Sequence, residues 1–527
     1  MKLGIKLVII CFLFTSGSSS QTTWERTYGI PNRWEDCYSV ISTYDHGFIY
    51  ANNFLAEYSS GNYRYCTWLL KTDINGFPLW SKYFYNPSYT FGIFYLAEDP
   101  NGNIIATGQT NEVSLAGDSF IMLLNSCGEK IWCKRLHYMN MNYGFKVKVD
   151  SFGNYILFTR FASTNGLIER NQLWKFDTLG DILWNAQIVP EYDYPEIDDP
   201  TGYDFICISG GGFLFSGYAY MQDTTVPQQW WRLQHLLVKT DSLGNELWVK
   251  PDSLNLEKVG AICAVSEYND NFYSVGYFKD LIPRYLPYFA KVAQNGEILV
   301  ESILHPDTLY SILIGLQRID SSFFHSAQCF YDTSYDEFTG IFRTDTNGLL
   351  SGYKLNYSGH PHLGASTGSL NNKFLVAGYA PYNYSNPLDV DAWAMKVNEN
   401  LEYDSLYSFP FVYDSLCPFP IPTDTVDCDC DLITGYGEPV PVAEWYRMEI
   451  YPNPAGEKVR IRLNDLTGQE KMELKKVILF DLFGRRVMEK DFMAETSLET
   501  GRLNAGIYLV VVEQSGEVLA RGKLVVF

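Results

Sequence analysis

The chain alternates apolar and polar residues in short blocks, and the same blocks recur along most of its length. An apolar block such as CTWLLKTD leads into a turn that contains glycine, and a short block with tryptophan such as PLWSKYF follows the turn. Alternation over four to eight residues, with β-branched and aromatic enrichment, is typical of half-buried strands. The pattern therefore predicts β-hairpins rather than helices. The turn glycines are Gly76, Gly128, Gly180, Gly244, Gly296 and Gly348.

These glycines are separated by 52, 52, 64, 52 and 52 residues, and a degenerate seventh copy places Lys396 53 residues after Arg343. A fixed period of this size indicates one supersecondary unit that repeats around or along an axis. A further apolar strand, such as CYSVIS or AICAVS, precedes each unit and is suited to an innermost position. Four antiparallel strands in seven copies predict an all-β, seven-bladed β-propeller. A solenoid is the alternative, but repeats of about fifty residues are long for one coil of a β-helix.

The N-terminal segment TTWERTYG, from Thr22, has the Trp-x-Arg/Lys pattern of a fourth strand but no first three strands before it. In a propeller, such a strand completes the last blade and removes exposed sheet edges. We therefore expect residues from Thr22 to Tyr28 to pair with the strand around Trp393 to Val397.

Two residue types recur at fixed positions beside the turns. Asp-x-Asn-Gly and Asp-x-Leu-Gly favour tight hairpins, so these aspartates are expected to bond local backbone N–H groups rather than form a ring of metal ligands or acids. Tryptophans four residues after the turn glycine are expected to pack between blades. The aspartates are Asp73, Asp177, Asp241 and Asp345, and the tryptophans are Trp80, Trp132, Trp184 and Trp248.

The first twenty residues indicate that the chain is exported, and the net charge limits the classes of partner. Residues 1–20 carry Lys2 and Lys6, an apolar run LVIICFLF and the small residues SGSSS, which is typical of a secretory signal peptide. No other segment approaches the ~20 apolar residues of a membrane helix. The formal charge of the chain is −21, and it is carried by the residues before Met448, because the tail from Met448 onward is neutral. An acidic propeller argues against nucleic acid and anionic lipid as partners.

Export makes disulfides permissible, but most cysteines occur singly in expected strands, as Cys127 and Cys133 do, and are interpreted as small buried hydrophobes. Cys417, Cys428 and Cys430 lie instead in a stretch rich in Pro and Asp. We expect a disulfide that closes a loop from Cys417 to Cys428 or Cys430, although the spacing does not determine the partner.

The last eighty residues contain three ordered motifs: Tyr451-Pro452-Asn453-Pro454-Ala455, Asp481-Leu482-Phe483-Gly484 and Leu503-Asn504-Ala505-Gly506-Ile507-Tyr508, before a final strand with Lys523. Alternating strands separated by glycine turns predict a small β-sandwich. The motifs closely resemble the type A C-terminal sorting domain of the type IX secretion system of certain Gram-negative bacteria. The resemblance implies an Ig-like fold, recognition by the translocon, and export through the periplasm to the cell surface or the medium. An ordinary Ig-like adhesion module is the alternative. The sorting-signal residues implied are Tyr451, Pro452, Asn453, Pro454, Asp481, Gly484, Gly506, Tyr508 and Lys523.

The expected organisation is a signal peptide at 1–20, a propeller at 21–410, a linker rich in Pro, Asp and Cys at 411–447 and a sorting domain at 448–527. The repeats loosely resemble KTD-x-x-G-x-x-x-W propellers that such exported proteins often carry. Their Asp-to-Gly spacing departs from those of pyrroloquinoline-quinone enzymes and sialidase Asp-boxes, so neither chemistry is carried over.

Local motifs for chemistry are missing from the sequence: it has no G-x-S-x-G, H-E-x-x-H, P-loop or EF-hand pattern. His360-Pro361-His362 is interpreted as a turn rather than a metal site. Tyr218, Tyr220, Trp230 and Trp231 are interpreted as packing between blades, with a sugar-stacking platform as the alternative. We expect no cofactor, metal or catalytic residue. The leading hypothesis is a non-enzymatic binding or adhesion module for a glycan or a surface protein, and the alternative is a polysaccharide hydrolase or lyase.

Overall fold

The computed structural model describes most of the chain from residue 24 onward. The described residues are 24–29, 33–59, 62–86, 89–112, 117–137, 141–162, 169–188, 197–223, 230–251, 259–279, 285–304, 310–330, 337–357, 361–381, 390–408, 411–417, 420–433, 446–465, 474–481, 485–493, 495–514 and 517–527. The expected signal peptide lies outside them.

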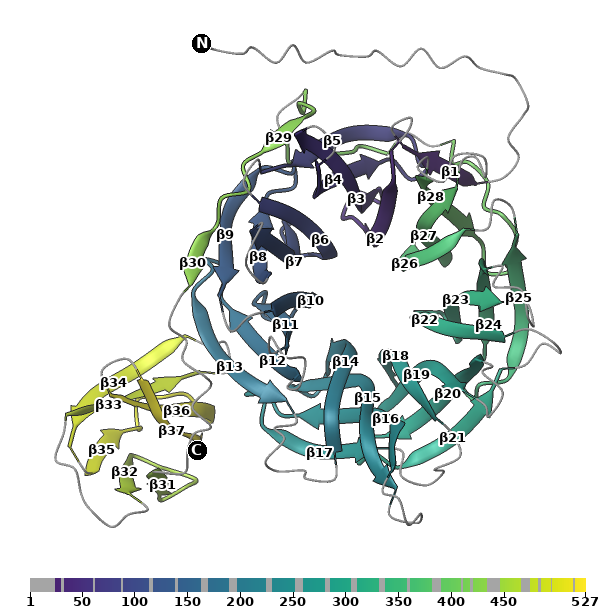
Figure 1. The fold of residues 1–527 in the computed structure, drawn as a ribbon. Helices are drawn as coiled ribbons and strands as arrows, with labels where there is room; N and C mark the ends of the chain where they lie inside the picture. The colour runs from purple at the N-terminus through teal and green to yellow at the C-terminus, as the bar shows by residue number, and fades with distance from the viewer. Residues whose placement is uncertain are drawn as a thin grey trace, which may run out of the picture.

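Within these residues, seven antiparallel sheets surround one axis as the blades of a propeller, each with four strands from the axis to the rim (Figure 1). The innermost strands are β2 (Glu35–Ser42), β6 (Tyr89–Glu98), β10 (Met141–Val149), β14 (Ile197–Cys207), β18 (Val259–Tyr268), β22 (Tyr310–Ile319) and β26 (His362–Ser369). The second strands are β3 (Phe48–Ser59), β7 (Ile104–Glu112), β11 (Tyr155–Ala162), β15 (Phe213–Asp223), β19 (Asn271–Lys279), β23 (Ser322–Phe330) and β27 (Lys373–Pro381).

The two outer layers complete each blade. The third strands are β4 (Asn62–Thr72), β8 (Asp118–Leu124), β12 (Glu169–Phe176), β16 (Trp230–Thr240), β20 (Tyr285–Ala293), β24 (Glu337–Thr344) and β28 (Val390–Val397). The fourth strands are β5 (Pro78–Phe84), β9 (Lys130–Leu136), β13 (Ile182–Ile188), β17 (Glu246–Pro251), β21 (Ile298–Ile303), β25 (Leu350–Asn356) and, in the seventh blade, β1 (Glu25–Tyr28). The seven-bladed propeller expected from the repeats is confirmed.

The ring closes through β1, as expected. Thr27 lies opposite Trp393 and Glu25 lies opposite Met395 in an antiparallel pair of β1 with β28. The Trp393 indole N–H also donates to Glu25 Oε1 at 2.7 Å. The N-terminal strand therefore completes the blade whose other three strands come from the end of the repeat region.

The two faces of the propeller differ in their connections. Because successive strands are antiparallel, the short hairpins between first and second strands, and between third and fourth strands, share one face, which we call the tight-turn face. The strand ends that the other connections join share the opposite face, which we call the loop face; most of those connections lie outside the described residues.

The turn aspartates behave as the sequence predicts. Asp73 Oδ1 accepts hydrogen bonds from the backbone N–H of Asn75 at 2.9 Å and of Phe77 at 2.7 Å. The other three aspartates, Asp177, Asp241 and Asp345, accept the equivalent pairs in their own turns. In the degenerate seventh copy, Leu401 occupies the left-handed position that glycine holds elsewhere, with φ 63°.

The recurring glycine and tryptophan contact each other between neighbouring blades. Gly180 has φ 84°, and a Cβ added to it would lie 3.0 Å from the ring of Trp132, which belongs to the preceding blade. The Trp132 indole N–H donates to the backbone carbonyl of Thr178 at 3.1 Å, and its ring lies 6.0 Å from that of Tyr155. The same contact joins Trp24 to Gly76, Trp80 to Gly128, Trp184 to Gly244 and Trp248 to Gly296. Packing of these tryptophans between blades is confirmed.

Residues 411–417 and 420–433, which we call the strap, lie against the rim of the first two blades. Within the strap, β29 (Asp424–Val426) pairs in parallel with β5, and β30 (Asp431–Ile433) pairs in parallel with β9. Each blade thereby gains a fifth strand that covers its outer edge (Figure 1). Three ion pairs join strap aspartates to lysines on the blades: Lys82–Asp424, Lys130–Asp427 and Lys134–Asp431.

The expected disulfide within the linker is wrong. Cys417 bonds to Cys127 and Cys430 bonds to Cys133, so both strap cysteines are joined to the propeller. Cys127 and Cys133 are accordingly not single buried cysteines. Cys428 is buried and forms no disulfide within the described residues. The parallel pairing of β30 with β9 brings Cys430 beside Cys133, and the bonds of Asp414 with Asp45 and Trp80 hold the segment that ends at Cys417 against the first blade.

The C-terminal domain is a small β-sandwich. One sheet has the order β31 (Tyr446–Tyr451), β32 (Lys458–Asp465), β35 (Glu495–Glu499). The other has the order β34 (Arg486–Phe492), β33 (Lys475–Phe480), β36 (Gly506–Gln514), β37 (Glu517–Val526). Alternate residues such as Val459, Ile461, Val510 and Val512 form its core. No helix in the described part of the chain is long and apolar enough to cross a membrane.

Candidate functional site

The first motif of the C-terminal domain, Tyr451 to Ala455, is hydrogen-bonded to the end of the last strand, β37. Tyr451, Pro452 and Pro454 are exposed. Asn453 Oδ1 accepts the backbone N–H of Val525 at 2.9 Å. The next residue, Ala455, donates its N–H to the Val525 carbonyl at 2.7 Å and accepts the N–H of Phe527 at 3.1 Å. Asn453 and Ala455 thus hold the exposed tyrosine and prolines against the last three residues of the chain.

The other two motifs reach the same end of the sandwich. Gly506 pairs with Val526, and Tyr508 is buried with its hydroxyl donating to the Asn504 carbonyl at 2.7 Å. Phe480, which pairs with Leu509, is followed directly by Asp481. The register therefore brings the first motif, the third motif and Asp481, the first residue of the second motif, to one end of the sandwich.

The remaining sorting-signal residues are placed as follows. Asp481 accepts the backbone N–H of Arg485 at 3.0 Å and pairs with its guanidinium at 2.8 Å. Lys523 lies opposite Leu509 in β37, close to the same edge. Gly484 lies outside the described residues. Their joint role in sorting stays a prediction.

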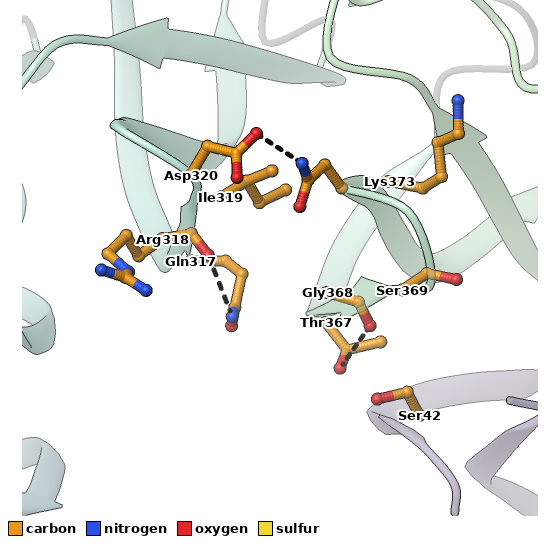
Figure 2. A pocket seen from close by; sticks show the side chains of 10 residues that line it. Ser42, Gln317, Arg318, Ile319, Asp320, Thr367, Gly368, Ser369 and Lys373 are labelled. Carbon is orange, nitrogen blue, oxygen red and sulfur yellow. Dashed lines mark hydrogen bonds between the residues drawn. The ribbon is translucent and has the colours of Figure 1, made fainter. Parts of the chain in front are cut away.

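The propeller has a pocket of about 400 Å³ on its tight-turn face, where the innermost strands of the sixth, seventh and first blades end. Gln317, Arg318 and Asp320 come from the β22–β23 hairpin, Thr367 and Ser369 from the end of β26, and Ser42 from the end of β2 (Figure 2). The hairpins of the two neighbouring blades are tied by a hydrogen bond from the Asn372 side-chain amide to Asp320. The lining is polar and contains one carboxylate, that of Asp320.

Two cations, Arg318 and Lys373, are among the residues that line this pocket. The guanidinium of Arg318 lies 4.3 Å from the centre of the Tyr268 ring, a position that favours a cation–π contact. Lys373 lies 3.5 Å from Asp404 and 3.9 Å from Glu399, so its charge is largely compensated. Arg318 forms no ion pair with the described residues. Its side chain points toward the fifth blade, on the face of β22 opposite Gln317, and away from Thr367 and Ser42 (Figure 2).

The loop face holds a second polar cluster at the start of β2 and β26. The Trp34 indole N–H donates to Asp36 Oδ1 at 2.5 Å, and the Trp34 ring lies 5.8 Å from that of Tyr379. The His362 ring stacks on the Tyr379 ring with 4.6 Å between the ring centres, and its Nδ1 lies 2.8 Å from Glu337 Oε2. Burial raises the pKa of the Asp36 carboxyl to about 6, although the bond from Trp34 lowers it. A carboxyl of this kind can donate a proton near neutral pH.

The aromatic and histidine candidates from the sequence are only partly resolved by the structure. The rings of Tyr218 and Tyr220 are 6.0 Å apart, and Tyr218 lies 5.5 Å from Tyr203 of the adjacent strand, so they form one half-buried tyrosine group. Trp230 and Trp231 lie in β16, but their side chains are outside the description, as is His360. No group of three or more His, Cys, Asp or Glu side chains in the described part of the chain could hold a metal ion.

Comparison with solved structures gives several distant likenesses. They include a protein of unknown function from Dyadobacter fermentans, with 11% identity and TM-score 0.38 over 70% of this chain and 97% of that one. An α-L-arabinofuranosidase of Fusarium graminearum in complex with arabinobiose has 11% identity and TM-score 0.34 over 59% of this chain and 93% of that one. An α-L-arabinanase of Penicillium chrysogenum complexed with arabinobiose has 15% identity and TM-score 0.33 over 57% of this chain and 91% of that one. At these scores the likenesses support no argument about this chain.

Sequence comparison identifies a family for the C-terminal tail, residues 449–526. No curated protein matches the chain. Residues 449–526 match the family model of the secretion system C-terminal sorting domain, and this range contains all three sequence motifs. The chain is thus a seven-bladed β-propeller that ends in a secretion system C-terminal sorting domain.

Proposed function

We propose that this protein is a propeller exported by the type IX secretion system through its C-terminal domain, and that outside the cell it acts as a non-enzymatic binding or adhesion module. The sorting-domain match supports the export route. The expected signal peptide at residues 1–20 would supply the first step, into the periplasm, and the exposed Tyr451–Pro454 edge would be presented to the translocon.

The observation that carries the binding function is the polar pocket on the tight-turn face. It joins hydrogen-bonding side chains from three blades in a volume of about 400 Å³, which is within the usual range of ligand pockets. Hydrolysis of a glycosidic bond generally requires two carboxyl groups, one on each side of the bond. The described lining offers only Asp320, which already accepts a hydrogen bond from Asn372. The pocket is therefore equipped to hold a hydroxylated ligand rather than to cleave one.

One observation favours the alternative, a polysaccharide hydrolase or lyase on the loop face. Asp36 combines a pKa of about 6 with neighbouring aromatic rings on which sugars can stack. A second carboxyl, Glu337, lies in the same cluster beyond Tyr379 and His362. This arrangement could supply an acid and a second carboxylate.

The test is to incubate the purified full chain with arrayed neutral and acidic glycans and bacterial surface proteins, and to assay the same glycans for new reducing ends and unsaturated uronates. We expect saturable binding without product. Product that is lost in Asp36→Asn would establish the enzymatic alternative. Neither binding nor product on any ligand would contradict the proposed function.

A further inference from the structure

We propose that four aromatic side chains on the innermost strands form a stacking surface for a chain of neutral pyranose sugars, at the axis of the propeller. This inference rests on the proposed binding function and adds to it a second site and the chemical class of its ligand. The four side chains, which we call the aromatic crescent, belong to the first four blades in order: Tyr38, Phe94, Phe145 and Tyr203. They lie part-way along β2, β6, β10 and β14, the strands nearest the axis (Figure 1).

A β-bulge in each blade places these side chains. In all seven pairings of an innermost strand with a second strand, the register shifts by one residue, so that two residues of the innermost strand oppose one residue of its partner. A bulge of this kind redirects the side chain of the extra residue. The extra residues, in the order of the blades, are Tyr38, Phe94, Phe145, Tyr203, Cys263, Ile314 and Gly364. The aromatic crescent is therefore one repeated structural position that carries a ring in four consecutive blades.

The rings of the aromatic crescent form a connected surface. The ring centre of Tyr38 lies 5.3 Å from that of Phe94, and the ring centre of Phe145 lies 6.3 Å from that of Tyr203. Tyr95, which follows Phe94, connects the two pairs, because its ring lies 5.8 Å from that of Phe145. Tyr38 is 41% exposed, and the other three side chains of the crescent are half-buried.

The exposed parts of these rings face the axis. An innermost strand has a neighbouring blade on either side and its own second strand behind it, so the solvent that reaches the rings lies along the axis (Figure 1). Opposite the crescent, the extra residues are smaller: Cys263, Ile314 and Gly364. No side chain fits at Gly364, because an added Cβ would lie 1.8 Å from the backbone carbonyl oxygen of Cys37. A ligand at the axis therefore meets rings on one side and small residues on the other.

The groups beside the rings favour a sugar over a purely apolar ligand. Lys146, which follows Phe145, pairs with Asp204, which follows Tyr203, at 2.6 Å. The Lys146 ammonium also lies 5.3 Å from the centre of the Tyr95 ring. An apolar ligand that covered this ion pair would remove water from it and return no hydrogen bond. A pyranose ring has an apolar C–H face that can stack on an aromatic ring, and hydroxyls at its edge that can replace the lost water.

The charge of the chain selects among sugars. A polyanionic glycan would meet the negative field of a chain whose formal charge is −21. Neutral pyranose chains avoid this repulsion. Among them, a β-1,4-linked glucan suits the crescent, because its ring hydrogens are axial and both faces of each sugar are apolar.

The experiment is calorimetric titration of the full chain with cellohexaose, a neutral β-1,4-linked glucan, and with toluene, an aromatic ligand without hydroxyls. We expect saturable binding of cellohexaose that hardly changes as salt is added, and no measurable binding of toluene. Tyr38→Ala should weaken cellohexaose binding by about twofold to tenfold, the range expected for the loss of one aromatic contact. Tyr38→Phe, which keeps the ring and removes the hydroxyl, should bind nearly as the parent does.

Tyr353→Ala is the matched control, since Tyr353 lies on the rim strand β25 and is 49% exposed, close to the value for Tyr38. It should bind cellohexaose as the parent does, and all three variants should keep the thermal midpoint of the parent. Unchanged affinity in Tyr38→Ala, an equal loss in Tyr353→Ala, or binding of toluene in place of cellohexaose would overturn the inference. If cellohexaose does not bind while the array finds another ligand, the inference fails and the binding function stands; if the array finds no ligand, both fail.

Discussion

Cys417 and Cys127 are joined by a disulfide across 290 residues of sequence, and Cys430 is joined to Cys133 in the same way. Together with β29 and β30, these bonds fix the strap to the first two blades. The segment that precedes the sorting domain is therefore part of the folded propeller up to residue 433.

Removing both disulfides should destabilise the propeller. Each disulfide contributes typically about 2–4 kcal/mol, so Cys127→Ser with Cys133→Ser should lower the thermal midpoint by several degrees. A reductant should lower the midpoint of the parent and leave that of the double variant unchanged. Mass spectrometry of non-reduced peptides should find Cys127 with Cys417, and a Cys417–Cys428 or Cys417–Cys430 peptide would contradict the assignment.

Two glycine substitutions can separate the energy of the contact between Gly180 and Trp132 from the energy of backbone strain. Gly180 and Gly153 have φ of 84° and 81°, but an added Cβ would meet Trp132 at Gly180 and nothing within 4 Å at Gly153. Gly153→Ala should lower the free energy of unfolding by about 1 kcal/mol, which is the penalty for an alanine in the left-handed conformation. Gly180→Ala should cost more, because Trp132 must also move. Equal shifts in the thermal midpoints would show that the contact between blades is unimportant.

Trp24 closes the ring, and its truncation should weaken the whole propeller. The side chain is fully buried, lies 6.1 Å from Phe48 in the first blade, and donates its indole N–H to the Ile74 carbonyl at 3.1 Å. Trp24→Ala should lower the free energy of unfolding by about 3–5 kcal/mol. Leu179→Ala, at a turn residue that is 73% exposed, is the control and should leave the thermal midpoint unchanged. A Trp24 variant as stable as the parent would contradict closure by β1.

The period in the sequence was sufficient to predict blades, ring closure and the roles of turn residues, because each of these depends on local spacing. The disulfides depend on how the strap crosses β5 and β9, and a spacing such as that of Cys428 and Cys430 carries no information about that path. The pocket was missed for a related reason. Asp320 lies in an ordinary hairpin turn, and only the packing of three blades brings it to one pocket with Thr367 and Ser42.

Stability should depend on the ionisation of Asp36. Its pKa is raised from 3.8 to about 6 in the folded chain, so the folded state favours the protonated carboxyl. This contribution to stability is complete below about pH 4 and is lost as the pH rises through about 6. At pH 7 the charged group costs up to about 3 kcal/mol. Asp36→Asn keeps an oxygen for the Trp34 N–H, and should match the parent at pH 4 and exceed its thermal midpoint at pH 7. A difference that does not change between these pH values would contradict the raised pKa.

The sorting domain should be required for export and dispensable for folding of the propeller. Residues 449–526 form a sandwich with its own core, and the disulfides that fix the strap lie entirely before it. The chain without residues 448–527 should therefore keep the thermal unfolding transition that the propeller shows in the full chain. Met493→Ala, at a half-exposed position of the sorting domain, controls for the effect of any substitution in this domain and should be exported normally.

The most direct measurement is the location of the chain in its native host, by fractionation and immunoblotting, with and without residues 448–527. The account predicts that the full chain reaches the cell surface or the medium and that the shortened chain accumulates, folded, in the periplasm. Normal display or release of the shortened chain would contradict export through the C-terminal domain.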